Sequence, residues 1–280
     1  MSEGPHLTLV AHLVELRRRV LRSLVALLLA TCLSFGLLYD VMKQVVQAPL
    51  GALDPDTTNV LARYNPVMTW LRPHVARAGA PVALRLHAMT AAEPFLVKFK
   101  LSLLCGLILS APFILYQGWA FVGAGLIERE RRAVRRWVPL SLLLFLVGVA
   151  FAYFVALPVA LCFLLSVDPE IEPLLMVGPY VSMVAVTVAL FGLAFQMPLA
   201  ARVLAGLGSV SVAALKRGRP YAIVLMFVVG ALLTPPDPFT QCLLAAPLVG
   251  LYELGILLAG AASKSATASR GQADQPAGKV

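Results

Sequence analysis

Long apolar runs separated by short polar segments dominate the chain. A membrane span needs about 20 apolar residues to cross roughly 30 Å of hydrocarbon. By that measure six runs stand out, at about residues 20–39, 95–121, 137–165, 180–204, 221–234 and 239–261. The pattern predicts an all-α, polytopic membrane protein in which residues 1–261 form a single domain of six transmembrane helices.

The fifth of these runs is short. At 1.5 Å per residue, residues 221–234 cover only about 21 Å, which is less than the hydrocarbon thickness. We therefore expect the bilayer to thin beside this helix, or flanking groups to reach back to the interface. A tight turn, Thr234-Pro235-Pro236-Asp237-Pro238, joins this run to the sixth. So short a turn predicts that the last two helices pack as an antiparallel hairpin.

A charged segment leads into the first run without an intervening proline or glycine. It reads His12-Leu-Val-Glu15-Leu-Arg17-Arg18-Arg19-Val-Leu-Arg22. Glu15 precedes Arg19 by four residues, which is the favourable order for an ion pair on a helix, and apolar residues recur at helical spacing. The segment and the span after it are therefore predicted to form one helix, with the arginines on the cytoplasmic side.

Loop charges determine the predicted orientation. Most Lys and Arg residues lie in the N-terminal segment, in residues 128–136 and 202–219, and in the tail, whereas residues 168–172 and Asp237 have no basic neighbours. We therefore expect a protein of the cytoplasmic (plasma) membrane with both termini in the cytoplasm, and no cleavable signal peptide. The first outer loop, residues 40–94, is expected to form a partly ordered cap on the outer surface. Residues 262–280 lack the apolar residues to fold and are predicted to be a disordered tail.

Composition supports the membrane assignment. Hydrophobic residues make up 60% of the chain and charged residues 13%, with a mean hydropathy of +0.85. Soluble domains contain about 25% charged residues. The net charge of +9 comes from basic residues beside the spans, so it indicates topology and not nucleic-acid binding. The four cysteines lie in apolar runs without a CxxC pair, which favours buried thiols over disulfides or metal ligands.

The sequence contains no recognisable catalytic constellation. All four histidines lie outside the predicted spans, which argues against a buried Ser-His pair, a haem ligand set and an intramembrane zinc site. The segment Gly206-Leu-Gly208-Ser209 lacks the Lys and the spacing of a phosphate-binding loop and indicates a turn. We therefore predict no enzyme activity, no metal and no cofactor.

A few polar groups lie at unusual depth. Gln196 lies midway along the fourth run beside Pro198, where a buried amide either bonds a neighbouring helix or faces water. Glu253 lies in the cytoplasmic half of the sixth run and needs a cation, from Arg202 or from the basic second inner loop.

Other features of the runs concern helix shape and depth. Lys98 and Lys100, at the outer end of the second run, can extend their stems to the headgroups. Prolines inside four of the runs are expected to bend their helices: Pro112, Pro158, Pro198 and Pro247.

The first inner loop repeats the pattern of an acid among bases. It reads Gly125-Leu-Ile-Glu128-Arg129-Glu130-Arg131-Arg132. The predicted topology puts both Glu15 and Glu130 at the cytoplasmic surface near helix ends, where a carboxylate can accept two parallel bonds from a guanidinium. Such bonds at a partly desolvated site are worth roughly 1.5–3 kcal/mol each, against about 0–1 kcal/mol for an exposed pair. Two such carboxylates could bind two arginines of a partner. The competing interpretation is neutralisation by the chain's own arginines, Arg17, Arg18, Arg131 and Arg132.

Several sequence fragments occur in a characteristic order along nearly the whole chain. They are His12-Leu-x-Glu15-Leu-Arg17-x-Arg19, Ala48-Pro49-Leu50, Pro94-Phe95 through Lys100, Ser110-Ala-Pro112, Leu115-Tyr-Gln117, Trp119-x-Phe121 through Leu126 to Glu130-Arg131, Phe151-Ala-Tyr-Phe154, Phe191-Gly to Phe195, Arg219-Pro-Tyr221, Leu233-Thr-Pro-Pro-Asp237, Gln241 and Pro247 to Tyr252-Glu253. Their joint order on these spans resembles the TatC family, the multispanning subunit of the twin-arginine protein translocase.

This resemblance implies a glove-like arrangement of six helices with a concave face. It also implies a receptor for the twin-arginine signal peptides of folded precursor proteins, which the proton-motive force drives across the membrane. Carried over by position, the residues expected to bind the signal peptide are Glu15, Arg17, Phe121 and Glu130, with His12, Leu16 and Arg131 as neighbours.

The resemblance further implies partners within the membrane. Single-span subunits of the TatA and TatB type would dock on the concave face and the last hairpin, and the chain would self-associate among membrane lipid. The polar residues expected to contribute to docking are Gln196, Thr234, Asp237, Gln241 and Glu253. The prolines expected to have structural roles are Pro49, Pro112, Pro198, Pro235 and Pro236.

The chain departs from the family pattern at three places. Ala124 stands where the family often has Pro, Gln196 stands where it often has Glu, and the first outer loop is long. Because a neutral amide does not titrate, Gln196 is not expected to relay protons. A secondary transporter of a small solute is the alternative function, suggested by the prolines and Gln196, but it would need internal repeats and a midplane cluster of charges. A membrane enzyme acting through Ser110 or Ser182 ranks third.

Overall fold

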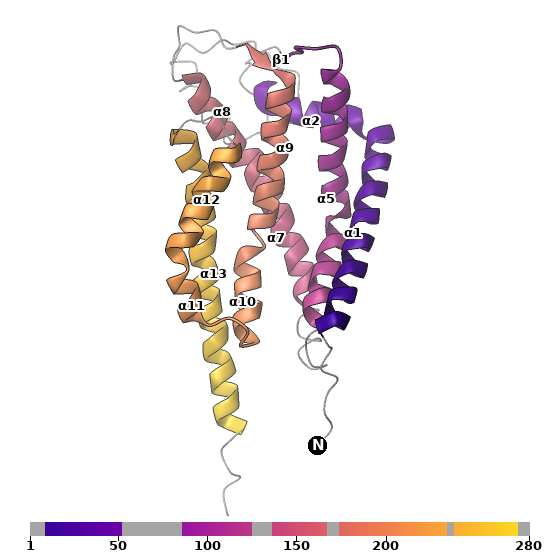
Figure 1. The fold of residues 1–280 in the computed structure, drawn as a ribbon. Helices are drawn as coiled ribbons and strands as arrows, with labels where there is room; N and C mark the ends of the chain where they lie inside the picture. The colour runs from indigo at the N-terminus through magenta and orange to yellow at the C-terminus, as the bar shows by residue number, and fades with distance from the viewer. Residues whose placement is uncertain (1–8, 52–85, 125–135, 167–173, 234–237, 274–280) are drawn as a thin grey trace, which may run out of the picture.

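The computed structural model describes residues 9–51, 86–124, 136–166, 174–233 and 238–273 of the 280 residues. Helices make up almost all of this part of the chain (Figure 1). In order they are α1 (Leu9–Leu37), α2 (Tyr39–Gly51), α5 (Glu93–Ala124), α7 (Trp137–Phe151), a π-helical turn η1 (Ala152–Ala156), α8 (Leu157–Ser166), α9 (Val177–Ala194), α10 (Met197–Gly206), α11 (Val212–Arg217), α12 (Arg219–Leu233) and α13 (Pro238–Ala273).

The fold class predicted from the apolar runs, an α-helical polytopic membrane protein, is confirmed. Five helical stretches of the described chain are long and apolar enough to cross a membrane: Leu13–Leu37, Glu93–Gly123, Trp137–Leu164, Val177–Gly206 and Gln241–Ser263. The remaining apolar helix, Arg219–Ala231, is shorter. It overlaps the run, residues 221–234, that the sequence marks as short. An apolar segment in a membrane favours helix because every backbone donor and acceptor is then satisfied within the segment.

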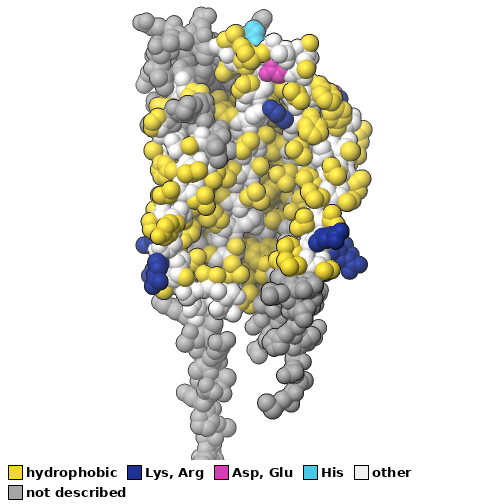
Figure 2. Space-filling view, viewed as in Figure 1, with side chains coloured by type: hydrophobic (Ala, Val, Ile, Leu, Met, Phe, Trp, Pro, Cys, Tyr) yellow, Lys and Arg dark blue, Asp and Glu magenta, His cyan; other side chains and the backbone are white. Residues whose placement is uncertain are grey.

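The two ends of the bundle differ in charge. The start of α1 and the end of α13 lie at the same end (Figure 1), and Lys and Arg side chains gather there on the visible face (Figure 2). We call this the basic end. The opposite end, called the cap end, carries α2, which lies across the helices (Figure 1).

The helices pack in a chain of neighbours. Helix α1 packs on α5, α5 on α9, α9 on α7, and α10 and α12 on α13. Small residues let the backbones approach closely, as is usual where helices meet in lipid. A Cβ added to Gly106 of α5 would lie 2.7 Å from the backbone nitrogen of Thr31 in α1, and one added to Gly192 of α9 would lie 2.7 Å from the Phe145 ring of α7.

Two tyrosine hydroxyls bind backbone carbonyls of α2 at the cap end, and a proline explains one of these contacts. The backbone carbonyl of Val45 would normally accept from the residue four positions on, but that residue is Pro49, which has no N–H. The Tyr153 hydroxyl of η1 donates to this carbonyl at 2.7 Å, and the Tyr180 hydroxyl of α9 donates to the Val46 carbonyl at 2.8 Å. Pro49 thus leaves the Val45 carbonyl free to accept a bond that holds α2 against the bundle.

A short sheet and a buried carboxylate join the segment before α5 to the segment before α9. Strand β1 (Leu86–His87) pairs in parallel with β2 (Leu175–Met176), a contact that the sequence did not predict. Glu93 beside them is buried, and its carboxylate accepts from the backbone nitrogens of Met89 at 2.5 Å and Gly178 at 2.8 Å. Gly178 has no room for a Cβ, because the Glu93 carboxylate would contact it.

The two lysines of α5 do not simply extend to the headgroups. The Lys100 ammonium donates to the Ser182 hydroxyl of α9 at 2.7 Å, so it joins two helices. The Lys98 ammonium lies over the rings of Phe35 and Tyr39, 4.5 and 5.0 Å from their centroids. A cation at this depth is stabilised by the ring faces as well as by water.

Three other expectations need correction or completion. Helix α13 continues to Ala273, beyond the expected start of a disordered tail at residue 262, because the alanine-rich segment extends an existing helix at little cost. The thiols of Cys105 and Cys162 are buried as predicted, but Cys32 and Cys242 are exposed on the outside of the helices, where lipid suits an apolar thiol equally well. The glycine segment after α10 is a turn as predicted, with Gly208 at φ 76°.

The prolines of the runs interrupt their helices to different degrees. Pro112 and Pro247 lie inside α5 and α13, which continue through them. Pro158 is the second residue of α8, one position after η1 ends, where the π-helical turn accommodates the missing donor. Pro198 lies at the start of α10, after a break at Phe195 and Gln196.

The Tyr153 contact yields a stability test. Changing Tyr153→Phe removes the donor to the Val45 carbonyl and is expected to cost about 1 kcal/mol of unfolding free energy. In a Pro49→Ala background the cost should shrink, because the new backbone N–H can donate to that carbonyl instead. Thermal unfolding in detergent measures both. An equal cost in the two backgrounds would contradict the role given to Pro49.

Candidate functional site

A groove of about 360 Å³ lies between α1 and α5 at the basic end. Both helices present mainly apolar side chains to it because each continues as a membrane span. The lining residues are Leu16, Arg19, Val20, Ser23, Leu24, Leu27, Ile114, Gln117, Gly118 and Phe121. Three of them are polar, and two of these three contact each other.

A polar network crosses the groove at Arg19. The guanidinium Nη2 of Arg19 lies 2.5 Å from Oε1 of Glu15, one helical turn earlier on α1. Its Nη1 donates to Oε1 of Gln117 on α5 at 3.2 Å. The exposed fraction is 30% for the Glu15 side chain and 13% for that of Arg19, and Gln117 is buried. The carboxylate is thus the accessible end of a network that becomes more buried toward α5.

The residues expected to bind a signal peptide divide into three groups. Leu16 and Phe121 line the groove beside this network, on α1 and α5 respectively. Arg17 is exposed and is not among the lining residues, while His12 lies in the first turns of α1. Glu130 and Arg131 fall outside the described residues.

The partner of Glu15 is the cation at helical spacing. Among the described residues, Glu15 pairs with Arg19 and not with Arg17 or Arg18. The carboxylate is therefore paired with one of the chain's own arginines, as the competing interpretation holds, but with a different arginine from those it named. Sequence reasoning did not select Gln117 for the site. The available signal was a polar amide within an apolar run, four residues before Phe121 and therefore on the same face of α5.

Gln196 is bonded between helices. The Ser141 hydroxyl of α7 donates to its Oε1 at 2.6 Å, and its Nε2 donates to the Ser141 carbonyl at 3.0 Å. The amide therefore joins α7 to the break between α9 and α10. Of the two possibilities left open by the sequence, the interhelical bond is the one observed.

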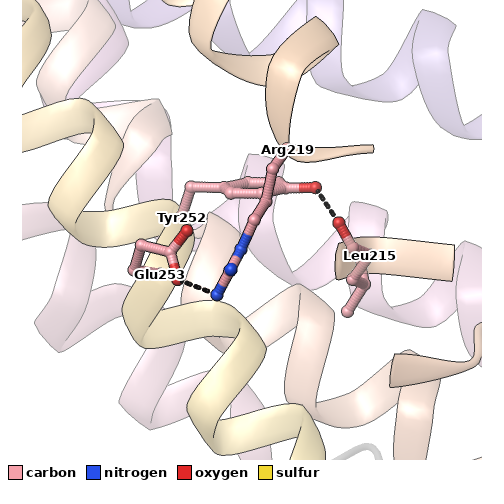
Figure 3. A network of polar contacts seen from close by, with 4 residues as sticks. All are labelled: Leu215, Arg219, Tyr252 and Glu253. Carbon is pink, nitrogen blue, oxygen red and sulfur yellow. Dashed lines mark hydrogen bonds and ion pairs between the residues drawn. The ribbon is translucent and has the colours of Figure 1, made fainter. Parts of the chain in front are cut away.

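Glu253 has the ion pair expected of it, with a cation from the second inner loop (Figure 3). Arg219 Nη2 lies 2.6 Å from its Oε2, while the neighbouring Tyr252 hydroxyl donates to the Leu215 carbonyl at 2.8 Å. Arg202, the other candidate partner of Glu253, contacts a different residue: its guanidinium lies over the Trp137 ring, 5.1 Å from the centroid. These contacts hold α11 and the start of α12 against α13.

The last two helices pack together as the short turn predicted. Helix α12 lies against α13, and Gln241 Nε2 donates to the Phe227 carbonyl at 2.8 Å. Four residues expected to act here fall outside the described residues: Thr234, Pro235, Pro236 and Asp237.

The described part of the chain gives no support to a metal site or to an enzyme that acts through Ser110 or Ser182. It contains no cluster of His, Cys, Asp or Glu that could hold a metal ion. The Ser110 hydroxyl donates to the Gly106 carbonyl at 2.6 Å, and that of Ser182 donates to the Gly178 carbonyl at 2.8 Å. Arg19 is the charged residue in the lining of this apolar groove, and the Glu15 carboxylate, which is not a lining residue, is paired with it. A partly exposed carboxylate beside an apolar groove suits a ligand that carries a cation next to an apolar segment.

Comparisons with known proteins agree on one family. A family model described as Sec-independent protein translocase protein (TatC) matches residues 11–247. The chain is 39% identical to a protein of that name from Azotobacter chroococcum over 89% of its length and 87% of the relative's, and 36% identical to that of Escherichia coli K12 over 89% and 86%.

Solved structures give the same result. The chain resembles the crystal structure of a twin arginine translocase receptor, TatC, with a TM-score of 0.74 and 34% identity, covering 90% of this chain and 99% of that one. A second crystal structure of such a receptor, in the detergent DDM, gives a TM-score of 0.72 at 35% identity and covers 89% of this chain and 99% of that one.

The Gln196 contacts yield a second stability test. Changing Gln196→Leu leaves the buried Ser141 hydroxyl and its carbonyl without this partner, and should cost about 1–2 kcal/mol of unfolding free energy. Adding Ser141→Ala should cost less in that background than alone, because the two residues share their bonds. Thermal unfolding of the four proteins tests this, and strictly additive costs would contradict the pairing.

Proposed function

The chain belongs to the TatC family of Sec-independent protein translocase proteins, and on that premise we propose that it is the receptor subunit that binds twin-arginine signal peptides. Its place in a protein translocase follows from the family. The finer role is supported by one observation above all: a partly exposed carboxylate, that of Glu15, is paired with Arg19 in the wall of an apolar groove. The proteins in the two similar crystal structures are described as receptors, which supports the same role.

The chemistry of such a signal matches the groove. A guanidinium offers two parallel N–H groups to a carboxylate, whereas a lysine ammonium offers a single charged point. Glu15 is partly shielded from water, so a bond to it is worth roughly 1.5–3 kcal/mol. An apolar segment next to the arginines would lie against Leu16 and Phe121.

Glu130 is proposed as the second acid, for the second arginine of the pair. It lies in the loop after α5, the helix that also carries Gln117 and Phe121. His12, Arg17 and Arg131 are proposed as supporting neighbours. Arg17 is exposed on α1, which suits contact with the headgroups or the polar part of a precursor protein.

The proposed orientation puts the basic end in the cytoplasm, in the plasma membrane. Arginine and lysine beside spans are retained on that side, and both the start of α1 and the end of α13 lie there (Figure 1). A signal peptide on a newly made, folded precursor would then meet the groove from the compartment in which it was synthesised, and the proton-motive force would drive the export that follows.

Single-span subunits of the TatA and TatB type are proposed to dock at the last hairpin. The short helix α12 exposes an apolar stripe at helical spacing, formed by Tyr221, Val224, Leu225 and Val228. Gln241 and Glu253 already bond within the hairpin, so their contribution would be to hold its shape. Gln196 is likewise engaged, which removes one of the two features that suggested a small-solute transporter.

Photo-crosslinking tests the proposed recognition. A photoreactive twin-arginine signal peptide is added to membranes that contain the chain, and labelling is compared after Glu15→Gln, Glu130→Gln and both together. Each change should weaken binding at least tenfold, because about 1.4 kcal/mol corresponds to that factor.

Glu253→Gln is the matched control. It also neutralises a carboxylate in the same half of the protein, but one that pairs with Arg219 away from the groove, so labelling should be retained. Undiminished labelling in the double variant of Glu15 and Glu130 would refute the site.

A further inference from the structure

The carboxylate of Glu15 is held by a residue that reaches it from the buried side. Arg19 uses one terminal nitrogen for Glu15 on α1 and the other for Gln117 on α5, which lies 98 positions further along the chain. We propose that Arg19, anchored by Gln117, is a positioning residue: it fixes Glu15 by one oxygen and leaves the rest of the carboxylate for the arginine of the signal peptide. This inference rests on the proposed function and deepens it.

Burial separates the roles of the three side chains. Gln117 is 5% exposed, the Arg19 side chain 13% and that of Glu15 30%. A ligand coming from the basic end therefore meets the carboxylate first, while the guanidinium of Arg19 lies beneath it. The order of exposure is that of a support under a contact group and not that of a second contact group.

The carboxylate retains acceptor capacity in this arrangement. The Arg19 contact involves Oε1, and the described residues provide no ion pair for Oε2. A carboxylate has about four acceptor sites on its two oxygens. An incoming guanidinium can therefore bond across both oxygens while Arg19 stays in place.

The alternative is that Arg19 competes with the ligand and must leave. That would strand a mostly buried cation without its carboxylate, which is unfavourable because an unpaired buried charge loses hydration without compensation. The Nε of Arg19 is already buried without a hydrogen-bond partner among the described residues. Loss of the Glu15 contact would therefore leave a further buried donor of this guanidinium without an acceptor. Retention of Arg19 is therefore favoured over displacement.

The anchor matters because the ion pair alone is weak. Two long side chains at i and i+4 on a helix surface gain little from pairing, since each loses rotamer freedom. The bond to Gln117 fixes Arg19 through a second helix, so the orientation of Glu15 depends on how α1 packs on α5. A carboxylate that is already oriented loses less freedom when it binds a guanidinium fork.

The test uses the full-length protein in detergent and a fluorescent twin-arginine signal peptide, with a twin-lysine peptide beside it. Gln117→Met removes the amide anchor at similar size without changing any charge. Affinity for the twin-arginine peptide should fall roughly three- to tenfold. The ratio of affinities for the twin-arginine and twin-lysine peptides should also fall, because the Glu15 carboxylate is no longer oriented for a guanidinium group.

Two variants distinguish positioning from a general structural role. Gln47→Met makes the same exchange at an exposed residue of α2, at the cap end and away from the groove, and should leave affinity unchanged. In a Glu15→Gln background, Gln117→Met should have no further effect on affinity, since the group that it positions is gone. A loss of the same size in that background would mean that Gln117 only supports the fold, and would overturn the inference.

The other outcomes are equally decisive. Unchanged or tighter binding in Gln117→Met overturns the inference, and tighter binding in Arg19→Gln identifies Arg19 as a competitor. Either result leaves the proposed function standing if Glu15→Gln still reduces the preference for the twin-arginine peptide. If Glu15→Gln itself binds like the unaltered protein, the recognition site and its support both fail.

Discussion

A polar group inside an apolar bundle has to find its partner within the protein, because lipid offers none. This constraint decides which helix faces meet. Bonds of this kind join neighbouring helices at several places, and they are Arg19 to Gln117, Ser141 to Gln196, Gln241 to the Phe227 carbonyl, Lys100 to Ser182 and Tyr153 to the Val45 carbonyl. Apolar packing alone would not distinguish one rotation of a helix from another, since lipid and leucine are equally apolar.

One of these bonds differs from the others in what lies beyond it. The Arg19 bond continues to a partly exposed carboxylate, that of Glu15, whereas the others end inside the bundle. In the proposed mechanism, the bond that joins α1 to α5 also orients the carboxylate that recognises arginine, so recognition depends on helix packing.

The sequence was sufficient for features that depend on local pattern. Hydropathy located the helices, and the i,i+4 spacing anticipated the Glu15 and Arg19 pair. It was insufficient where a contact joins distant segments: Gln117 as the anchor, the choice between the two cations offered for Glu253, and the β1 and β2 pairing. Spacing along the chain says which face a residue shares with its near neighbours, but not which other helix lies against that face.

In the proposed mechanism, acids at the cytoplasmic end of this protein read the arginine pair of an exported precursor. The most direct measurement is export of a folded reporter in cells in which this chain replaces the resident TatC protein. We predict that a reporter with an arginine pair in its signal is exported, and that changing the pair to two lysines reduces export at least tenfold, the factor that about 1.4 kcal/mol provides. Equal export of the two reporters would contradict this mechanism.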